Sequence, residues 1–498
     1  MAVIRKIALV RGNPTDDMPD FLRWRAVVPP LGLMYLAGYL RDRCPGRYEL
    51  RILDPGVERV GVETVRRRVA EFGADVVGLS GLSADVPEML AIAGALRRTL
   101  PSARLVFGGP CTISDAERLA RVAGVAAVVV GEGEETFRDL LDALETGRDL
   151  ATVPGIVFWN GSDAVRTPKR PAIGDLDALP FPAWDLIDVP AYSDGPHNMT
   201  YGIFKKKPYM AIFTSRGCPF HCTYCHWSFG HEFRTRSPEN VLAEIEALRR
   251  DHGVREFHFF DDSFNLDAPR AKRIMDLIVE RGLDVALCFP NGVRGDTMDE
   301  ELIVKMARAG TYFMAFAIES ASPRLQKYLR KNNDLEKLAV NIAVARREGI
   351  MPLGFFMLGF PGETPEELEL TISVACELEL VYAYFFTVVP FEGTELARQV
   401  RERGDFKFEF DRRWTYHSMR PYYSQATGID VTAYQRRAYL RFYSKPWRLM
   451  RLLWLHPSKL LAIRNFFKWL WFLLVVSSDL GNRLDDRQAD VLARWHKA

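Results

Sequence analysis

The sequence lacks several features that mark special classes of protein. No stretch of eighteen uncharged apolar residues occurs, so we expect no membrane-spanning helix. Residues Met1 to Lys6 lead directly into a predicted strand, and no signal peptide follows. Only 7 cysteines occur in 498 residues, without regular pairing, which argues against a disulfide framework and predicts a reducing, cytoplasmic location. Neither internal repeats nor low-complexity tracts are present, and the net charge of +2 identifies no partner.

The first 148 residues alternate short apolar runs with helical patterns. Strands are predicted at Lys6–Val10, Leu50–Leu53, Asp75–Ser80, Arg104–Phe107 and Ala126–Val130. Helices are predicted at Leu31–Arg43, Val62–Phe72, Val86–Thr99, Asp115–Val122 and Glu135–Leu144. Strands that are apolar throughout and separated by helices indicate a doubly wound α/β domain with a parallel sheet. Such sheets bind their ligands beyond the carboxyl ends of the strands.

Glycine is frequent in the loops at these predicted strand ends. The candidate ligand-binding residues there are Gly12, Asn13, Ser80, Gly81, Ser83, Gly108, Gly109, Gly131, Glu132 and Gly133. A glycine lets a large flat ligand approach the backbone closely, but it also simply makes a tight turn. The pattern alone leaves both interpretations open.

Residues 149–205 are rich in Pro, Gly and Asp, which predicts a linker with a small hairpin formed by Gly155–Asn160 and Ala164–Thr167. Residues 206–400 again alternate strands and helices. The predicted strands are Tyr209–Thr214, Glu256–Phe260, Asp284–Phe289, Tyr312–Ala317, Pro352–Met357 and Ala383–Val388. The predicted helices are Pro238–Asp251, Ala268–Arg281, Asp299–Ala309, Ser322–Leu329, Leu335–Glu348 and Pro365–Leu378. Barrels of such units carry functional residues at the carboxyl ends of their strands.

Three cysteines, Cys218, Cys222 and Cys225, follow the first of these strands. Soft thiolates suit iron–sulfur clusters and zinc. A 4Fe–4S cluster normally takes four cysteines, so three leave one iron open to bind a molecule that reacts. The alternatives are a zinc site completed by a nearby histidine, and a disulfide, which an odd number of closely spaced thiols disfavours. The nearby histidines are His221, His226 and His231.

The cysteine spacing, with an aromatic residue directly before Cys225, resembles the radical S-adenosylmethionine (SAM) superfamily. The resemblance implies a partial (β/α)6 barrel, a 4Fe–4S cluster on the three cysteines, and cleavage of SAM to a 5′-deoxyadenosyl radical. The SAM contacts that it implies are Tyr224, Asp261, Asp262, Glu319, Gly359 and Gly362. Taken singly, the two aspartates also suit helix caps and Glu319 an ion pair. Arg216 and Arg294 are candidates to pair with the SAM carboxylate.

The N-terminal region resembles the cobalamin-binding domain of one class of this superfamily, through Pro29 to Leu33 and Val129 to Glu134. The resemblance implies that cobalamin binds in the glycine loops. Many such domains carry Asp-x-His, whose histidine binds cobalt. Here Asp54 is followed by Pro55 and Gly56, and no histidine precedes His197, so we expect no histidine ligand from this domain.

This class most often implies C-methylation, here of an unactivated carbon in a hydrophobic or natural-product small molecule, with an external electron donor such as flavodoxin or ferredoxin. The alternative is a cyclase, a ring-contracting enzyme or another enzyme that modifies lipids or tetrapyrroles. A different class altogether would be a non-catalytic metal-cluster protein at the membrane surface.

Residues 401–498 leave the barrel pattern and predict a helical region. From Val431 to Ser478 there are no Asp or Glu, nine Lys or Arg, and eleven aromatic residues. One predicted helix places Arg437, Arg441, Lys445 and Arg448 on a single face unless Pro446 breaks it, and a second runs from Ser458 to Gly481. Such composition suits a helix in a membrane interface, or equally a helical cap over the barrel mouth with its aromatic residues in the core. A nucleic-acid partner is not predicted, because the stretch is too apolar for a phosphate groove.

Overall fold

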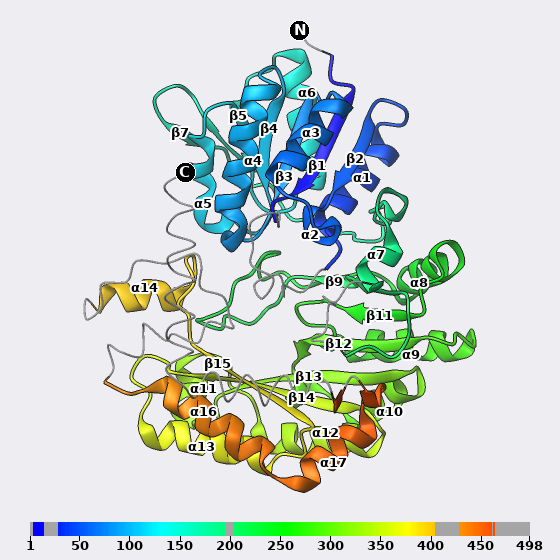
Figure 1. The fold of residues 1–498 in the computed structure, drawn as a ribbon, viewed down its shortest axis with the longest axis vertical. Coiled ribbons are helices and arrows are strands. Elements are labelled where there is room, and N and C mark those ends of the chain that lie inside the picture. The colour runs from blue at the N-terminus through cyan, green and yellow to red at the C-terminus, as the bar shows by residue number, and fades with distance from the viewer. Residues whose placement is uncertain (1–2, 14–27, 195–202, 404–427, 461, 464–498) are drawn as a thin grey trace.

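The computed structural model describes residues 3–13, 28–194, 203–403, 428–460 and 462–463. Within them the chain forms two large sheets with helices on their faces, one above the other (Figure 1). Strand β1 starts near the N-terminus and runs toward the barrel below it, so the carboxyl ends of the N-terminal parallel strands face the barrel (Figure 1).

The N-terminal sheet has the order β2-β1-β3-β4-β5-β6-β7. Its strands are β1 (Lys6–Arg11), β2 (Glu49–Leu53), β3 (Val76–Ser80), β4 (Arg104–Gly108), β5 (Val125–Val129), β6 (Ile156–Trp159) and β7 (Ala164–Arg166). Its helices are α1 (Leu31–Arg43), α2 (Pro55–Glu58), α3 (Val62–Phe72), α4 (Val86–Thr99), α5 (Thr112–Ala120) and α6 (Glu134–Thr146). The five predicted strands and five predicted helices are confirmed, with α5 beginning three residues earlier than expected.

The side chains of β1 show why this sheet needs helices on both faces. Ile7 and Leu9 belong to one buried cluster, with residues of α1 and α6. Ala8 and Val10 belong to another, with residues of α3, α4 and α5. Successive side chains of a strand point to opposite faces, so a strand that is apolar throughout buries both.

The predicted hairpin forms, but its place in the fold differs from the prediction. Instead of standing in a linker, β6 pairs antiparallel with β5, and β7 pairs with β6, so both extend the N-terminal sheet. Ile156 and Val157 are buried there. The proline-aromatic stretch that follows contacts both domains. Ala183 N donates to Met34 O of α1 at 3.1 Å, and Trp184 Nε1 donates to Glu244 Oε1 of helix α8 (Pro238–His252) at 3.1 Å.

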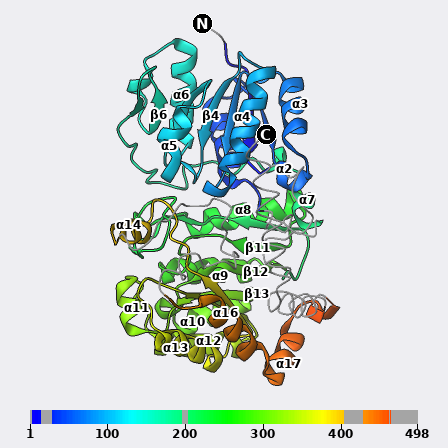
Figure 2. The same ribbon diagram turned by 60° about the vertical axis from the view of Figure 1, so that its left-hand side comes forward.

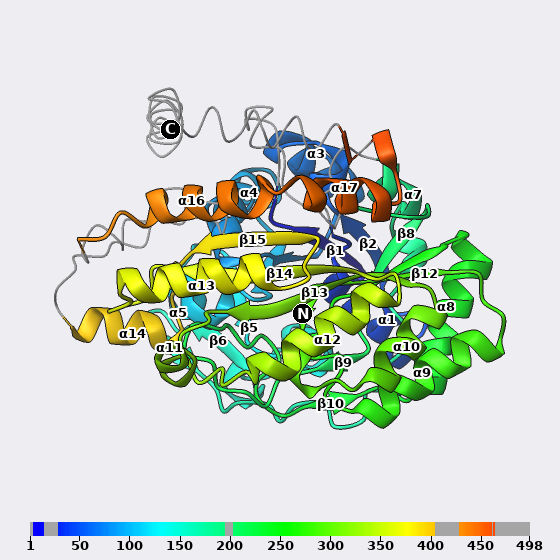
Figure 3. The same ribbon diagram turned by 90° about the horizontal axis from the view of Figure 1, so that it is seen from below.

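The second sheet has the order β15-β14-β13-β12-β11-β8, and all its strands are parallel. The strands are β8 (Tyr209–Ile212), β11 (Glu256–Phe259), β12 (Ala286–Val293), β13 (Thr311–Glu319), β14 (Met351–Leu358) and β15 (Tyr382–Thr387). Six helices connect or follow them, α8 (Pro238–His252), α9 (Ala268–Glu280), α10 (Glu300–Arg308), α11 (Pro323–Tyr328), α12 (Leu335–Arg347) and α13 (Pro365–Glu377). Figures 2 and 3 show helices α9 to α13 on the outer side of these strands, which confirms the partial barrel.

Helix α16 (Val431–Tyr443) covers the open edge of this sheet at β15. Tyr443 Oη accepts a hydrogen bond from Ala383 N at 3.1 Å, and Tyr439 Oη accepts one from Phe385 N at 3.2 Å. Gln435 Nε2 donates to Phe385 O at 2.6 Å. Side chains of α16 therefore form hydrogen bonds with backbone N–H and C=O groups at the edge of β15, which would otherwise be available to pair with another strand.

The predicted basic helix face does not form, because Pro446 begins a new helix, α17 (Pro446–Leu455). Arg437 and Arg441 pair with Glu369 of α13, whereas Arg448 is buried and donates to Cys376 O at 2.9 Å. The helix predicted from Ser458 to Gly481 lies outside the described residues beyond Ile463. In the described part of the chain, none of the helices combines the length and the apolar character needed to cross a bilayer.

Candidate active site

The three cysteines lie on a loop, residues 217–233, that a short ribbon closes at its base. Strands β9 (Ser215–Arg216) and β10 (Arg234–Thr235) pair antiparallel on either side of it. Within the loop Cys218 and Cys222 are half-buried and Cys225 is exposed. Thr223 N donates to Leu329 O at 3.1 Å, and Ser263 Oγ donates to Cys218 Sγ at 3.3 Å. Contacts from the C-terminal end of helix α11 and from the segment after β11 therefore support the loop.

The donor set fits a cluster better than a single zinc ion. Within the described residues, no three His, Cys, Asp or Glu side chains are close enough to bind one metal ion. Zinc needs four ligands around one point, whereas each thiolate of a 4Fe–4S cluster binds a different iron. The Cys225 side chain reaches solvent, but protein surrounds its flanks, and this partial burial together with the neighbouring Cys222 raises the pKa of Cys225 to about 12. Cys225 therefore needs a metal cation to become a thiolate ligand near neutral pH.

Asp261 and Asp262 follow β11, and neither caps a helix. Asp261 Oδ1 is buried and accepts hydrogen bonds from Thr214 N at 3.0 Å, Thr214 Oγ1 at 2.8 Å and the Ser215 hydroxyl. Asp261 thereby holds the chain just before the cysteine loop. The Asp262 side chain opens to solvent, but protein surrounds its flanks, and this partial burial together with Asp261 raises its pKa to about 6. Its carboxylate also accepts a hydrogen bond from the backbone of Gly217.

Glu319, at the end of β13, has an unusual backbone. Its φ of +69° lies in the left-handed region, which residues with side chains rarely occupy and which is more frequent at functional sites. The carboxylate is buried, lies 3.7 Å from Lys331 Nζ and hydrogen-bonds Tyr224. Burial raises the pKa of Glu319. Lys331 was not singled out from the sequence, because one lysine in a polar connection resembles an ordinary surface residue.

Tyr224 and the turn Gly359–Gly362 also meet. The ring of Tyr224 packs against Phe360 of that turn, with a centroid distance of 6.0 Å and an angle of 58°. The structure thus gathers Tyr224, Glu319 and the turn after β14 beside the cysteine loop. The two candidate arginines already have protein partners: Arg216 Nη2 donates to Glu134 at 2.6 Å, and Arg294 Nε donates to Asp296 at 3.1 Å.

Glu363 was also missed, and it supports this turn from within the protein. Its Oε2 accepts hydrogen bonds from Gly359 N at 2.6 Å and Phe360 N at 2.9 Å. Burial raises its pKa from 4.5 to about 7. Between these pH values the folded protein keeps a proton that the unfolded chain has lost. The free energy of unfolding therefore falls as pH rises through this window and levels off above it.

We expect Glu363→Gln to remove this loss of stability. The variant should be more stable than the wild type at pH 8 by about 1–3 kcal/mol, because the amide carries no charge to desolvate. Urea unfolding at pH 5 and pH 8 measures the difference. Glu366→Gln, at an exposed position in the first turn of α13, is the control and should leave the pH dependence between pH 5 and pH 8 unchanged. Equal pH dependence in wild type and Glu363→Gln would contradict the assignment.

Some residues of the predicted cobalamin loops already contact other parts of the protein, and others leave space for a ligand. A Cβ atom at Gly12 or Gly81 would lie within 3 Å of Met89 side-chain atoms, so these glycines make room for the protein itself. Ser83 Oγ lies 3.5 Å from Ser114 Oγ. Glu132 is engaged in ion pairs with Arg216 and Arg234.

Other positions at the same strand ends are free to meet a ligand. Gly131 has a φ of +85°, and among the described residues, its two chain neighbours aside, no atom lies within 4 Å of the position that a Cβ atom would take there, which leaves space beside the backbone. Asn13 Oδ1 is buried and has no hydrogen-bond partner among the described residues. Asp54, which stands where many cobalamin domains begin Asp-x-His, accepts a hydrogen bond from Tyr192 Oη at 2.9 Å. Gly131 and Asn13 fit a bound ligand, while Gly12, Gly81 and Glu132 have structural roles.

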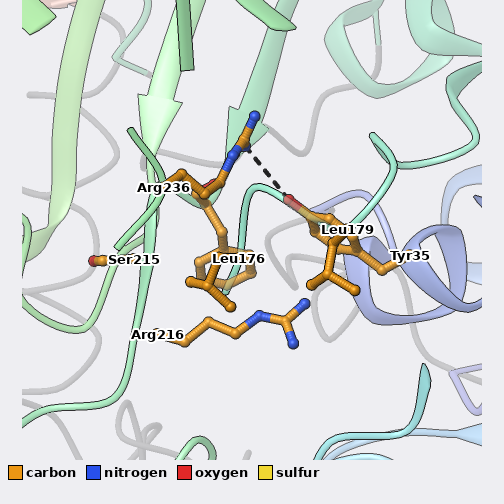
Figure 4. Close-up of a pocket in the computed structure, with 7 residues that line it drawn as sticks. Tyr35, Leu176, Leu179, Ser215, Arg216 and Arg236 are labelled. Atoms are coloured by element: carbon orange, nitrogen blue, oxygen red, sulfur yellow. Dashed lines mark hydrogen bonds between the residues drawn. The ribbon is translucent and has the colours of Figure 1, made fainter. Parts of the chain in front are cut away.

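A small cavity of about 10 Å³ lies at the seam between the two domains, and Figure 4 shows its lining. Tyr35, Ser215, Arg216 and Arg236 contribute to it, and Arg236 Nη1 lies 3.5 Å from the Tyr35 hydroxyl. This volume suffices for a water molecule at most. The cavity is part of the domain seam and is too small for a cofactor.

Comparison with known proteins agrees with this geometry. Residues 212–375 match the family described as the radical SAM superfamily, and residues 23–141 match the B12 binding domain. The chain is 30% identical over 446 residues to an uncharacterized methyltransferase of Pyrococcus horikoshii. The matched region covers 88% of this chain and 94% of that protein. The chain belongs to the radical SAM superfamily. It is an enzyme of the class that carries a B12 binding domain before the radical SAM domain.

Two further comparisons characterise this radical SAM enzyme. It is 30% identical over 427 residues to cytidylyl-2-hydroxyethylphosphonate methyltransferase of Streptomyces wedmorensis, covering 75% of this chain and 78% of that protein. Its fold is similar to that of the radical SAM methyltransferase TsrM from Kitasatospora setae, with a TM-score of 0.65 and 22% identity over 80% of this chain and 76% of that one. The cofactors of the two matched families are a 4Fe–4S cluster with SAM, and cobalamin.

Proposed function

We propose that this protein is a cobalamin-dependent radical SAM methyltransferase that methylates an unactivated carbon of a hydrophobic small molecule. The observation that carries the proposal is the contact between the base of the cysteine loop and the start of α6, through Arg216 and Glu134. That contact brings the residues suited to both cofactors to one end of the barrel. When bound, the cluster with SAM supplies hydrogen abstraction and cobalamin supplies the methyl group. Both relatives described above are named as methyltransferases.

In this proposal the chain's own residues bind and orient. Cys218, Cys222 and Cys225 hold the cluster. Tyr224, Glu319 and the Gly359–Gly362 turn hold the nucleoside part of SAM, and Asp262 receives its ammonium group through a charge-assisted hydrogen bond. Asp261 contributes indirectly, by holding Thr214 and Ser215 in place just before the cysteine loop. On the N-terminal side, Asn13, Ser80, Gly108, Gly109, Gly131 and Gly133 frame the cobalamin.

An apolar wall inside the barrel supports a hydrophobic substrate. Ala317, Phe355 and Tyr384 are register neighbours across β13, β14 and β15, and Met357 and Phe386 form the next row. All five are half-buried and uncharged. The Phe355 and Tyr384 ring centroids are 6.4 Å apart. Phe355 and Tyr384 pack on a buried cluster that contains no residue of helices α8 to α13. Because those helices cover the outer face of the strands, Phe355 and Tyr384 lie on the inner face.

Anaerobic assays with labelled SAM test the proposed function. Protein reconstituted with iron and sulfide, and produced with cobalamin supplied to the host, should contain cobalamin after purification. After reduction it should convert SAM to 5′-deoxyadenosine. With SAM carrying a CD3 group, the label should appear in a product when lipophilic extracts of the source cells are added. Replacing the chemical reductant by reduced flavodoxin tests our further proposal of an external one-electron donor.

The outcomes of this assay separate the candidate functions. Cyclase chemistry is the second candidate, because relatives of the chain include anaerobic magnesium-protoporphyrin IX monomethyl ester cyclases. A cyclase would form 5′-deoxyadenosine without transferring the label. Absence of 5′-deoxyadenosine under every condition would contradict both candidates and favour a non-catalytic cluster protein.

We also propose that the C-terminal region contacts a membrane surface. On and after α17, Met450, Trp454 and Leu460 are 63%, 78% and 82% exposed. Arg451 and Lys459 lie beside them in the chain, and basic residues next to exposed apolar side chains favour an interface with anionic lipid. The alternative, a helical cap over the barrel mouth, stays a prediction, because α16 covers the edge of the sheet at β15.

Liposome flotation tests the membrane proposal. We expect vesicles containing anionic lipid to capture the wild type and to bind Trp454→Ser/Leu460→Ser roughly 100- to 1000-fold more weakly, because burial of each large apolar side chain contributes about 2 kcal/mol. Leu440→Ser, which changes a 48% exposed leucine on α16, is the control and should float like the wild type. Equal flotation of all three proteins would contradict the proposal.

A further inference from the structure

Two arginines stand side by side at the base of the cysteine loop. Arg216 and Arg234 are cross-strand partners in the β9–β10 ribbon, and their side chains are only 6% and 4% exposed. Like charges directly opposite each other in a ribbon repel. Burial also removes the water that would solvate them. The ribbon that closes the loop therefore requires anionic partners from elsewhere in the protein.

The N-terminal domain supplies these anions. Arg216 Nη2 donates to Glu134 Oε1 at 2.6 Å, Arg234 Nη2 donates to Glu132 Oε1, and Glu132 Oε2 lies 3.5 Å from Arg216 Nη1. The two glutamate side chains are 8% and 6% exposed. We call this neutral, buried group of Glu132, Glu134, Arg216 and Arg234 the Glu–Arg clamp.

Aromatic rings and backbone groups complete the clamp. The Arg216 guanidinium lies 5.1 Å from the ring of Tyr35 on α1 and 5.2 Å from that of Phe229 in the cysteine loop. Figure 4 shows Arg216 extending beneath Tyr35. Arg234 Nη1 donates to Ile173 O at 2.6 Å, and Ile173 N donates to Glu132 Oε2 at 3.0 Å. A planar guanidinium satisfies such stacked and forked contacts, which lysine does not.

The clamp lies between the two regions assigned to cofactors. Glu132 lies in the turn between β5 and α6, and Glu134 is the first residue of α6, at the carboxyl edge of the N-terminal sheet. Its arginines lie on the two strands that enclose residues 217–233, and Arg216 is two positions before Cys218. Movement of Arg216 would therefore move the first cluster ligand.

We propose that the Glu–Arg clamp fixes the cysteine loop against the N-terminal domain and thereby sets the separation between the cluster and the ligand of that domain. The four residues are positioning residues, because they act through the loop and touch no reacting atom. The inference rests on the fold and on membership of the superfamily, and it does not require that the reaction be a methylation.

Hydrogen exchange of the iron-reconstituted protein tests the clamp without any turnover. Glu134→Gln leaves the Arg216 charge buried without its nearest anion. We expect backbone exchange in residues 217–233 to accelerate about tenfold through local opening, with unchanged exchange in β11 to β14. Glu135→Gln is the matched control, because Glu135 is the next residue, is 41% exposed and pairs with Arg170 at 3.2 Å. It should leave the loop unchanged.

A second variant and a spectroscopic readout keep the test decisive if Glu134→Gln folds poorly. Arg216→Lys retains the positive charge but loses the stacked, forked contacts, so it should accelerate the same exchange. With cobalamin bound as Co(II) and the cluster reduced, either variant should broaden the distance distribution between the two spins measured by pulsed electron paramagnetic resonance. Wild-type exchange in both Glu134→Gln and Arg216→Lys would overturn the proposal. If no cobalamin binds, the proposed function fails, but the exchange result still decides the clamp.

Discussion

Replacing any one of Cys218, Cys222 or Cys225 by alanine is expected to abolish formation of 5′-deoxyadenosine from SAM. Each thiolate binds its own iron, so a missing ligand leaves a second iron uncoordinated by protein and destabilises the cluster. We expect the iron content to fall to a small fraction of the wild-type value and turnover to fall by more than about 100-fold. Loss of a residue that only supports a metal ligand can cost up to about 100-fold, and loss of the ligand itself should cost at least as much. Iron analysis, visible absorption and anaerobic product assays measure these losses.

The chain contains matched controls for this experiment. Cys288 and Cys376 are buried, lie on β12 and α13, and stand outside the cysteine loop. Cys288→Ala and Cys376→Ala should retain the cluster and turnover, with at most a modest loss of stability. If all three loop variants retained iron and activity, the assignment of the cluster would be wrong.

Substitution of Glu319 is expected to have the second-largest effect, and the choice of replacement separates its two roles. Glu319→Ala removes the carboxylate that contacts Tyr224 and Lys331 but keeps a side chain at a φ of +69°. Glu319→Gly also removes the carboxylate but suits this backbone. Both should lower SAM cleavage about 100-fold, the size expected when one polar contact to a reacting group is lost.

Stability should distinguish the two Glu319 variants. The glycine variant should be more stable than the alanine variant by about 1 kcal/mol, because it avoids the cost of a left-handed backbone. Iron content should stay near wild type in both, since no cluster ligand changes. If Glu319→Gly restored SAM cleavage, the residue would serve only the backbone, and its assignment to SAM would be wrong. Thermal unfolding and single-turnover assays of 5′-deoxyadenosine provide the measurements.

Much of the architecture could be predicted from local patterns. Continuous apolar runs predicted the strands, because both faces of a parallel sheet are buried. The segment Thr364-Pro365-Glu366-Glu367 predicted the start of a helix. The structure shows that Thr364 and Glu367 form a capping box at the start of α13. The cysteine spacing likewise predicted a cluster loop, since the three proposed ligands lie within eight consecutive residues. In these cases the interacting groups are close in the chain.

The tertiary structure decided which partner each buried charge has. Glu132 stood in a turn typical of cobalamin domains, and Arg216 was a candidate for the SAM carboxylate, yet both belong to the Glu–Arg clamp. Lys331 and Glu363 carried no local signal at all. The hairpin β6–β7 extends the N-terminal sheet, and α16 covers the edge of β15.

The sequence by itself determined the elements and their order and predicted the cluster ligands, because hydrophobic periodicity, capping and ligand spacing act over a few neighbouring residues. Only the tertiary structure decided the domain contact and the roles of its charged residues. Arg216 and Glu134 are 82 residues apart, and a charged side chain is compatible with many partners until packing excludes water and leaves one anion within reach.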